Sequence, residues 1–183
     1  MQHTTLSAFC LFTLIFAGCH ADPTPAHRVA PVEPTSCGNV KNMHQIGDLY
    51  VAGGVTPSDY PLLKELGIKT ILNLRESEET PGVESAKLAK ANGILHVRIP
   101  WKGPDQLTDD RLDAMRRVLR EAERPLLFHC GSANRVSAGW LAYRVLDEGV
   151  DLEAAVAEAK TFGLRTPAYE TITRGYIARQ TKR

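Results

Sequence analysis

The sequence predicts one α/β domain built on a central, mostly parallel sheet that is flanked by helices. Short apolar runs typical of buried strands alternate with segments whose apolar residues recur at helical spacing. The amino-terminal stretch differs in composition, and no internal repeat divides the rest of the chain. A domain over residues 37–183 is long enough to enclose a substantial core.

Apolar pattern, capping residues and proline positions place the individual elements. The expected strands lie near Leu49 and over 70–74, 94–99 and 126–128. The expected helices are opened by Thr56 and Pro57, lie near 83–91, start at Asp109 and at Arg135, and are capped by Asp151 and by Thr166 with Pro167. The carboxyl-terminal third is therefore expected to be helical.

Residues 126–136, Leu-Leu-Phe-His-Cys-Gly-Ser-Ala-Asn-Arg-Val, place a cysteine between a predicted buried strand and a predicted helix. The first N–H groups of a helix lack partners and carry the positive end of its dipole, so such a turn favours an anion. These groups and the guanidinium of Arg135 favour the thiolate of Cys130, which is a competent nucleophile. Arg135 can also hold two oxygens of a phosphoryl group. The candidate phosphate-binding residues are Gly131, Ser132, Ala133, Asn134, Arg135 and Val136.

This loop resembles the signature of the cysteine-dependent protein tyrosine and dual-specificity phosphatases: His-Cys, five residues, Arg, then Ser or Thr. Segments 48–54 and 66–75 are similar to the start of small bacterial members, and the resemblance covers about Gly38 to Gln180. It implies a phosphatase-like domain that hydrolyses phosphate monoesters, from protein phosphotyrosine or small phosphoesters, through a phosphocysteine and without a cofactor. In this chain the arginine arrives one residue early, and Val136 stands at the family's arginine position.

Two other functions remain open. A shorter loop that ends in arginine also resembles the rhodanese sulfurtransferases, although His129 before the cysteine and the sequence Asn73-Leu74-Arg75 favour a phosphatase. A non-catalytic pseudophosphatase that binds phosphorylated ligands is the other alternative.

The resemblance also implies a general acid on the loop before the nucleophile strand. Asp105, in a Gly-Pro segment able to hinge, is the best candidate. Asp109 and Asp110 are the alternatives, although acids at a helix start are explained by its dipole.

Other polar residues near the loop have two interpretations each. His129 either organises the loop or is a satisfied core histidine. Ser137, at the family's hydroxyl position, and Ser132 either donate to the sulfur or cap the helix. One of Glu76, Glu78 and Glu79 could orient Arg135, but a solvated acidic turn is the favoured interpretation. Arg165 is one of four arginines that could rim the site, although a solvated surface explains them equally.

The amino-terminal residues predict export. An apolar stretch over 6–16 runs into Phe-Ala-Gly-Cys, which resembles a bacterial lipobox. We expect a signal peptide over 1–18, lipidation of Cys19 and a proline-rich tether over 19–36, which gives a periplasmic protein anchored to the outer membrane. Cleavage after Ala21, giving a soluble periplasmic protein, is the alternative.

Charge and cysteine usage limit the partners. The chain has 22 basic and 21 acidic residues, a net charge of +1, so no global field favours nucleic acid or an anionic membrane. We expect a monomer whose partner is a phosphorylated protein or a small phosphoester, with membrane attachment only through the lipid. The four cysteines and six histidines show no metal-ligand spacing, so no metal site is expected. Reversible pairing of Cys37 with Cys130 is a weaker hypothesis.

Overall fold

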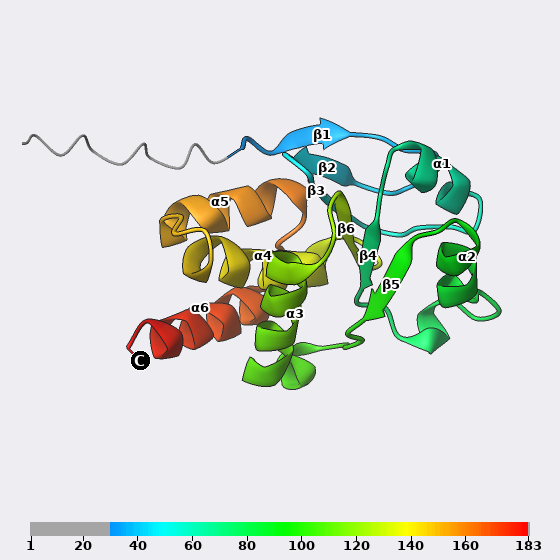
Figure 1. Cartoon of the computed structure of the whole chain (residues 1–183). Helices are drawn as coiled ribbons and strands as arrows, with labels where there is room; N and C mark the ends of the chain where they lie inside the picture. The colour runs from blue at the N-terminus through cyan, green and yellow to red at the C-terminus, as the bar shows by residue number, and fades with distance from the viewer. Residues whose placement is uncertain (1–29, 183) are drawn as a thin grey trace, which may run out of the picture.

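The computed structural model describes residues 30–182 and shows a six-stranded sheet with helices on both faces (Figure 1). The strands are β1 (Glu33–Thr35), β2 (Met43–Ile46), β3 (Leu49–Ala52), β4 (Thr70–Asn73), β5 (Leu95–Arg98) and β6 (Leu126–His129), in the order β1-β2-β3-β6-β4-β5. β3, β6, β4 and β5 pair in parallel, whereas β1 and β2 add an antiparallel edge. The predicted α/β fold with a mostly parallel sheet is confirmed.

Six α-helices in the described part of the chain cover the sheet. They are α1 (Asp59–Glu65), α2 (Ser85–Ala91), α3 (Asp109–Glu121), α4 (Asn134–Leu146), α5 (Leu152–Phe162) and α6 (Pro167–Thr181), with one-turn 3₁₀ helices at η1 (Ser77–Glu79) and η2 (Pro104–Gln106). Figure 1 shows α1 and α2 on one side of the sheet and α3 to α6 on the other. Each face of the sheet has its own hydrophobic core. Because side chains alternate along a strand, Ile71 and Leu127 pack in the core under α1 and α2, whereas Leu72 and Phe128 pack in the core under α3 to α6.

The four parallel strands bring their carboxyl ends to one edge of the sheet. Ala52 pairs with His129 there, and Asn73 pairs with both His129 and Arg98. Ligand sites in α/β sheets lie beyond this edge, and the predicted nucleophile follows directly after His129.

The two antiparallel strands, β1 and β2, were not predicted. β1 lies inside the segment expected to be a tether, and its Pro34 pairs with His44 at the outer edge, where a missing N–H is tolerated. Strands this short are defined by their pairing and leave little pattern of their own. The sheet therefore begins before residue 37.

Two predicted helix starts shift. α1 begins at Asp59 instead of Thr56, because the buried Asp59 carboxylate accepts bonds of 2.7 Å from the N–H and the hydroxyl of Thr56 and holds that residue in a turn. α4 begins at Asn134, one residue before Arg135. The other predicted helices lie within about two residues of their expected positions.

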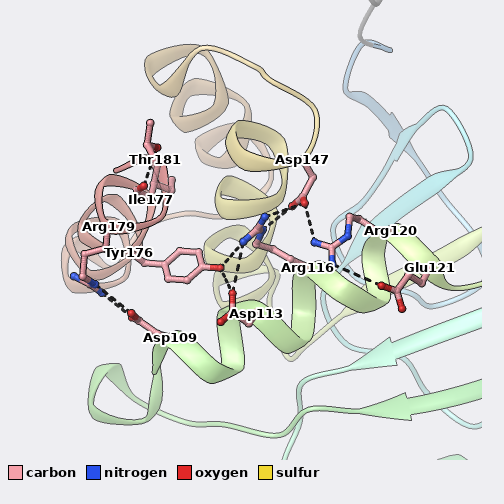
Figure 2. A network of polar contacts seen from close by, with 10 residues as sticks. All are labelled: Asp109, Asp113, Arg116, Arg120, Glu121, Asp147, Tyr176, Ile177, Arg179 and Thr181. Carbon is pink, nitrogen blue, oxygen red and sulfur yellow. Dashed lines mark hydrogen bonds and ion pairs between the residues drawn. The ribbon is translucent and has the colours of Figure 1, made fainter. Parts of the chain in front are cut away.

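A polar network joins α3, α6 and the end of α4 (Figure 2). Arg116 on α3 donates to both carboxylate oxygens of Asp147, at 2.6 and 2.9 Å, and to the Tyr176 hydroxyl at 2.6 Å. The Tyr176 hydroxyl in turn donates to Asp113 at 2.5 Å. Because Arg116 and Asp147 are largely buried, their bidentate pairing satisfies charges that would be costly if left alone. The network fixes the helical layer that supports the loop.

The predictions for the amino-terminal signal and for lipidation of Cys19 lie outside the described residues. Within residues 30–182, the helices are all too short or too polar to cross a membrane.

Candidate active site

Cys130 lies where β6 turns into α4. Its side chain is 1% exposed, and its backbone N–H donates to Ala52 O at 3.3 Å, which ties the loop to the end of β3. Ala133 takes a left-handed conformation with φ of 63°, and this turn opens α4 at Asn134. The first N–H groups of α4 therefore have no acceptor within the helix and lie beside the loop that carries the cysteine.

Two glycines enclose this loop. A Cβ on Gly53 would lie 3.0 Å from Lys41 O and 3.2 Å from Ser132 Cα, so a side chain there would require the neighbouring backbone to shift by a few tenths of an ångström. Gly163 approaches from the α5 end, where a Cβ would lie 3.2 Å from Ser132 O. The conformation of the loop is thus set by backbone packing on both sides.

Arg135 is fixed by a bidentate ion pair with Glu79. Its Nη1 donates to Glu79 Oε1 at 2.6 Å and its Nη2 to Glu79 Oε2 at 2.5 Å. Nη1 also lies 3.1 Å from Leu74 O and 2.7 Å from Trp101 O. The guanidinium therefore bridges the loops that follow β4 and β5, and it lies beside Gly131, where a Cβ would be 3.6 Å from Nη2.

This ion pair keeps both groups charged. Burial alone would lower the pKa of Arg135, but the Glu79 carboxylate and the nearby Cys130 outweigh it, so the pKa is raised. Burial would likewise raise the pKa of Glu79, but hydrogen bonds from Arg135 and from the Glu76 N–H lower it overall. The hydrogen bonds from Arg135 to oxygen atoms of residues 30–182 use only Nη1 and Nη2, so the Nε–H and the second Nη2 proton can serve the Cys130 sulfur or an oxyanion.

Glu79 thus orients Arg135, which was one of the two interpretations of the acidic turn. The favoured one, a solvated acidic turn, is wrong for Glu79, although Glu78 is exposed. The difference arises from η1, where the Glu79 carboxylate accepts from the Glu76 N–H at 2.9 Å and Arg75 Nη2 donates to Glu79 O at 2.6 Å. These bonds direct the third glutamate toward Arg135.

His129 is buried beneath the loop. Its Nδ1 lies 3.4 Å from Cys130 O, and its Nε2 has no protein partner among the described residues. Burial lowers the pKa of His129 to about 4, so the ring is neutral near neutral pH. The His129 ring thus lies against the loop backbone and adds no positive charge beside the sulfur.

Ser132 and Asn134 connect the loop to the segment between α5 and α6. Arg165 Nη2 donates to Ser132 Oγ at 2.6 Å, while Asn134 Oδ1 accepts from Arg165 N at 3.0 Å and Asn134 Nδ2 donates to Thr166 Oγ1 at 2.7 Å. Arg165 is exposed and places a second guanidinium at the loop. No sequence feature favours Arg165 over the other three candidate arginines, because its proximity to the loop depends on how α5 and α6 pack.

Ser137 and Val136 support the loop from within α4. The Ser137 hydroxyl donates to Ala133 O at 2.9 Å, so its proton is directed at the loop backbone and not at Cys130. Val136 is fully buried in the core, and only its backbone N–H belongs to the first turn of the helix. The departure from the family spacing thus puts a core side chain where the family places arginine.

The candidate acids differ in their surroundings. Asp105 lies in η2, is exposed, and makes no ion pair with any described residue. Its loop packs near α6, where Tyr169 contacts Trp101 with ring centroids 5.0 Å apart, and Trp101 O binds Arg135. Asp109 instead pairs with Arg179 at 2.6 Å (Figure 2), in keeping with a structural role, and Asp110 is exposed in the first turn of α3.

The hypothesis that Cys37 pairs with Cys130 does not fit this arrangement. Both cysteines are free, and Cys37 packs with the core under α1 and α2 whereas Cys130 belongs to the core under α3 to α6. The sheet separates them. Burial and the nearby Asp59 also raise the pKa of Cys37, which keeps it a thiol.

The fold and the cysteine–arginine loop define a phosphatase-like protein related to the cysteine-dependent protein tyrosine phosphatases. The chain belongs to the family described as the phosphatase-like domain of beta-lactamase hydrolase-like protein, whose model matches residues 43–146. The beta-lactamase hydrolase-like protein of Agrobacterium fabrum is 31% identical over 119 residues, which cover 63% of this chain and 26% of that protein. The chain therefore corresponds to only a part of that relative.

Solved structures show the same fold. TpbA of P. aeruginosa superposes with a TM-score of 0.65 at 21% identity, over 80% of this chain and 90% of that one. The core catalytic domain of the PP-IP phosphatase SIW14 from S. cerevisiae gives a TM-score of 0.65 at 23% identity, over 80% and 96% of the two chains.

Gly53→Ala should destabilise the protein by about 1–3 kcal/mol, because the added methyl group forces the end of β3 away from the loop. Gly54→Ala is the matched control, since a Cβ there would meet Gly131 O at 3.6 Å, an ordinary contact. Urea unfolding of the two variants measures the difference. Equal stabilities would show that the loop does not depend on this close approach.

The buried His129 should make stability depend on pH. Its pKa is lowered from 6.5 to about 4, so between these values the unfolded chain binds a proton that the folded one does not, and stability is lost as pH falls. The loss attributable to this residue is on the order of 3 kcal/mol. Urea unfolding at several pH values should show a shallower decline for His129→Asn, and an unchanged decline would assign the pH dependence elsewhere.

Proposed function

We propose that this domain is a cysteine-dependent phosphatase that hydrolyses phosphate monoesters through a phosphocysteine on Cys130. The carrying observation is the guanidinium of Arg135, which Glu79 holds beside the loop while two of its N–H groups stay available for an oxyanion. Family membership and the fold shared with TpbA support this assignment. A cysteine-to-serine variant of TpbA has been solved in complex with pTyr, which makes protein phosphotyrosine a substrate to test.

In the first step, the Cys130 thiolate attacks phosphorus and the bond from phosphorus to the leaving oxygen breaks. Asp105 gives its proton to that oxygen, and Arg135 with the first N–H groups of α4 stabilises the charge on the other phosphoryl oxygens. In the second step, water attacks phosphorus, Asp105 takes the proton from the water, and the phosphorus–sulfur bond breaks to release phosphate and the thiolate. Asp105 is exposed in η2 directly after Gly103 and Pro104, a context able to hinge over a substrate, which supports its role as the acid.

The site also indicates how the short loop could work. The family's arginine position is occupied by the buried Val136, and Arg135 is the second residue of α4. Glu79, Leu74 O and Trp101 O together hold the guanidinium beside Gly131 of the loop. The carboxylate thereby sets an orientation that the shortened spacing does not set by itself.

We further propose that this activity resides outside the cytoplasm on a monomer anchored through Cys19. The basis is the lipobox-like sequence before Cys19, followed by a proline-rich segment that reaches the domain. The lipid would then be the only attachment to the membrane.

Phosphate release from an aryl phosphate by the full chain tests the proposal. Cys130→Ser should reduce kcat by at least about a thousandfold, because the nucleophile is lost. Asp105→Asn should lower kcat by about a hundredfold, whereas Asp110→Asn, which removes an exposed carboxylate from a neighbouring helix, should leave it unchanged.

Release that persists in Cys130→Ser would contradict the mechanism. Absence of release by the wild type would overturn the proposed activity and favour the other two functions. Sulfur transfer from thiosulfate to cyanide would then identify a rhodanese, and binding of phosphotyrosine without turnover would identify a pseudophosphatase.

A further inference from the structure

A cavity lies at the carboxyl edge of the sheet, on the side covered by α2. Its volume is about 310 Å³, and its lining includes Arg75 after β4, Arg98 at the end of β5, and residues of η1 and the start of α2. The residues from Cys130 to Arg135 are not part of this lining. The cavity is therefore distinct from the candidate catalytic loop.

The charges around this cavity are unbalanced. Three basic side chains face one acidic residue, Glu84, whose carboxylate pairs with Lys87 at 2.7 Å. Arg75 and Arg98 make no ion pair with any residue of the described chain, 30–182. Two guanidinium groups that share a cavity and pair with none of its carboxylates favour an external anion.

The two arginines are held in place by neutral acceptors. Arg98 Nη2 donates to Arg75 O and to Ser77 Oγ, both at 3.1 Å, and Arg75 Nη2 donates to Glu79 O at 2.6 Å. The Nε of Arg75 is buried and has no acceptor among the described residues. Leaving a buried donor of a cation without an acceptor is costly, so a bound anion that accepts from the Arg75 Nε–H would be stabilised.

The remaining lining suits a phosphate group. The hydroxyls of Ser77, Thr80 and Ser85 lie around the cavity, and Val83 and Ala86 add apolar surface. A guanidinium presents planar pairs of donors that match the oxygens of a tetrahedral oxyanion, and hydroxyls bind the remaining oxygens. The volume admits a phosphate group together with some of the atoms attached to it.

The cavity communicates with the catalytic loop through Glu79. Arg75 binds the Glu79 backbone carbonyl, while the Glu79 carboxylate holds Arg135. Along β4, Asn73 lines the cavity whereas Leu72 and Leu74 pack in the core that contains Cys130. The two sites therefore lie on opposite faces of the same strand end.

We propose that this cavity is a second phosphate-binding site, with Arg75 and Arg98 as its cationic ligands. It takes either free phosphate or a second phosphate carried by the substrate, and in the latter case it rests on the function proposed above. Binding of phosphate itself requires no turnover.

An NMR titration of the full chain with inorganic phosphate tests the site. The backbone amides of Ser77 and Ser85 should shift saturably, separately from those of Gly131 and Ser132. Arg98→Gln should weaken the response of the first pair by about tenfold while the catalytic loop responds as in the wild type. Arg117→Gln is the matched control. Arg117 is also an exposed arginine, but it lies on α3 and does not line the cavity, so both responses should stay unchanged.

No saturable shift at Ser77 and Ser85, or a shift that Arg98→Gln leaves unchanged, would overturn the proposal. Kinetics with singly and doubly phosphorylated peptides then identify the source of the bound phosphate. A loss of kcat/KM in Arg98→Gln confined to the doubly phosphorylated peptide assigns the second phosphate of the substrate. Equal kcat/KM for both peptides, with the NMR response intact, assigns free phosphate. If the wild type hydrolyses neither peptide, the proposed phosphatase activity fails, whereas the NMR titration still tests the phosphate-binding site.

Discussion

The bidentate pairing of Arg135 with Glu79 is the interaction on which the candidate site depends. A largely buried guanidinium needs a carboxylate partner, and breaking such a pair leaves an uncompensated charge. Here the partner comes from the loop after β4, while the Trp101 carbonyl from the loop after β5 adds a further acceptor. One side chain thus joins three loops at the carboxyl edge of the sheet, and it supplies the positive charge that the neutral His129 does not.

The surrounding packing holds the loop that carries Arg135 in place. Gly53 and Gly163 press on the loop from two sides, and the buried Ser137 hydroxyl holds the Ala133 carbonyl from within α4. Behind these contacts, the network around Arg116 locks the helical layer. These contacts hold the loop in one conformation. Donors that are preorganised in this way stabilise a developing oxyanion most effectively.

Local pattern was sufficient for the four parallel strands and for the strand-to-helix turn that carries Cys130, because buried strands and capped helices leave strong signals there. It was insufficient where long-range contacts decide the outcome. The short β1 (Glu33–Thr35) exists through pairing with β2, and Arg165 reaches Ser132 only after α5 and α6 have packed. Choosing Glu79 from three neighbouring glutamates depended on the hydrogen bonds of η1. Sequence could name that acidic turn, but not the residue within it.

The central claim is that Glu79 makes the short loop competent by holding Arg135. The most direct test compares kcat/KM for an aryl phosphate in Glu79→Gln and in Glu78→Gln, an exposed neighbour in the same 3₁₀ turn. The account predicts a loss of at least about tenfold in Glu79→Gln, because the charge that orients the guanidinium is gone, and no change in Glu78→Gln. Equal and wild-type values in both folded variants would contradict it.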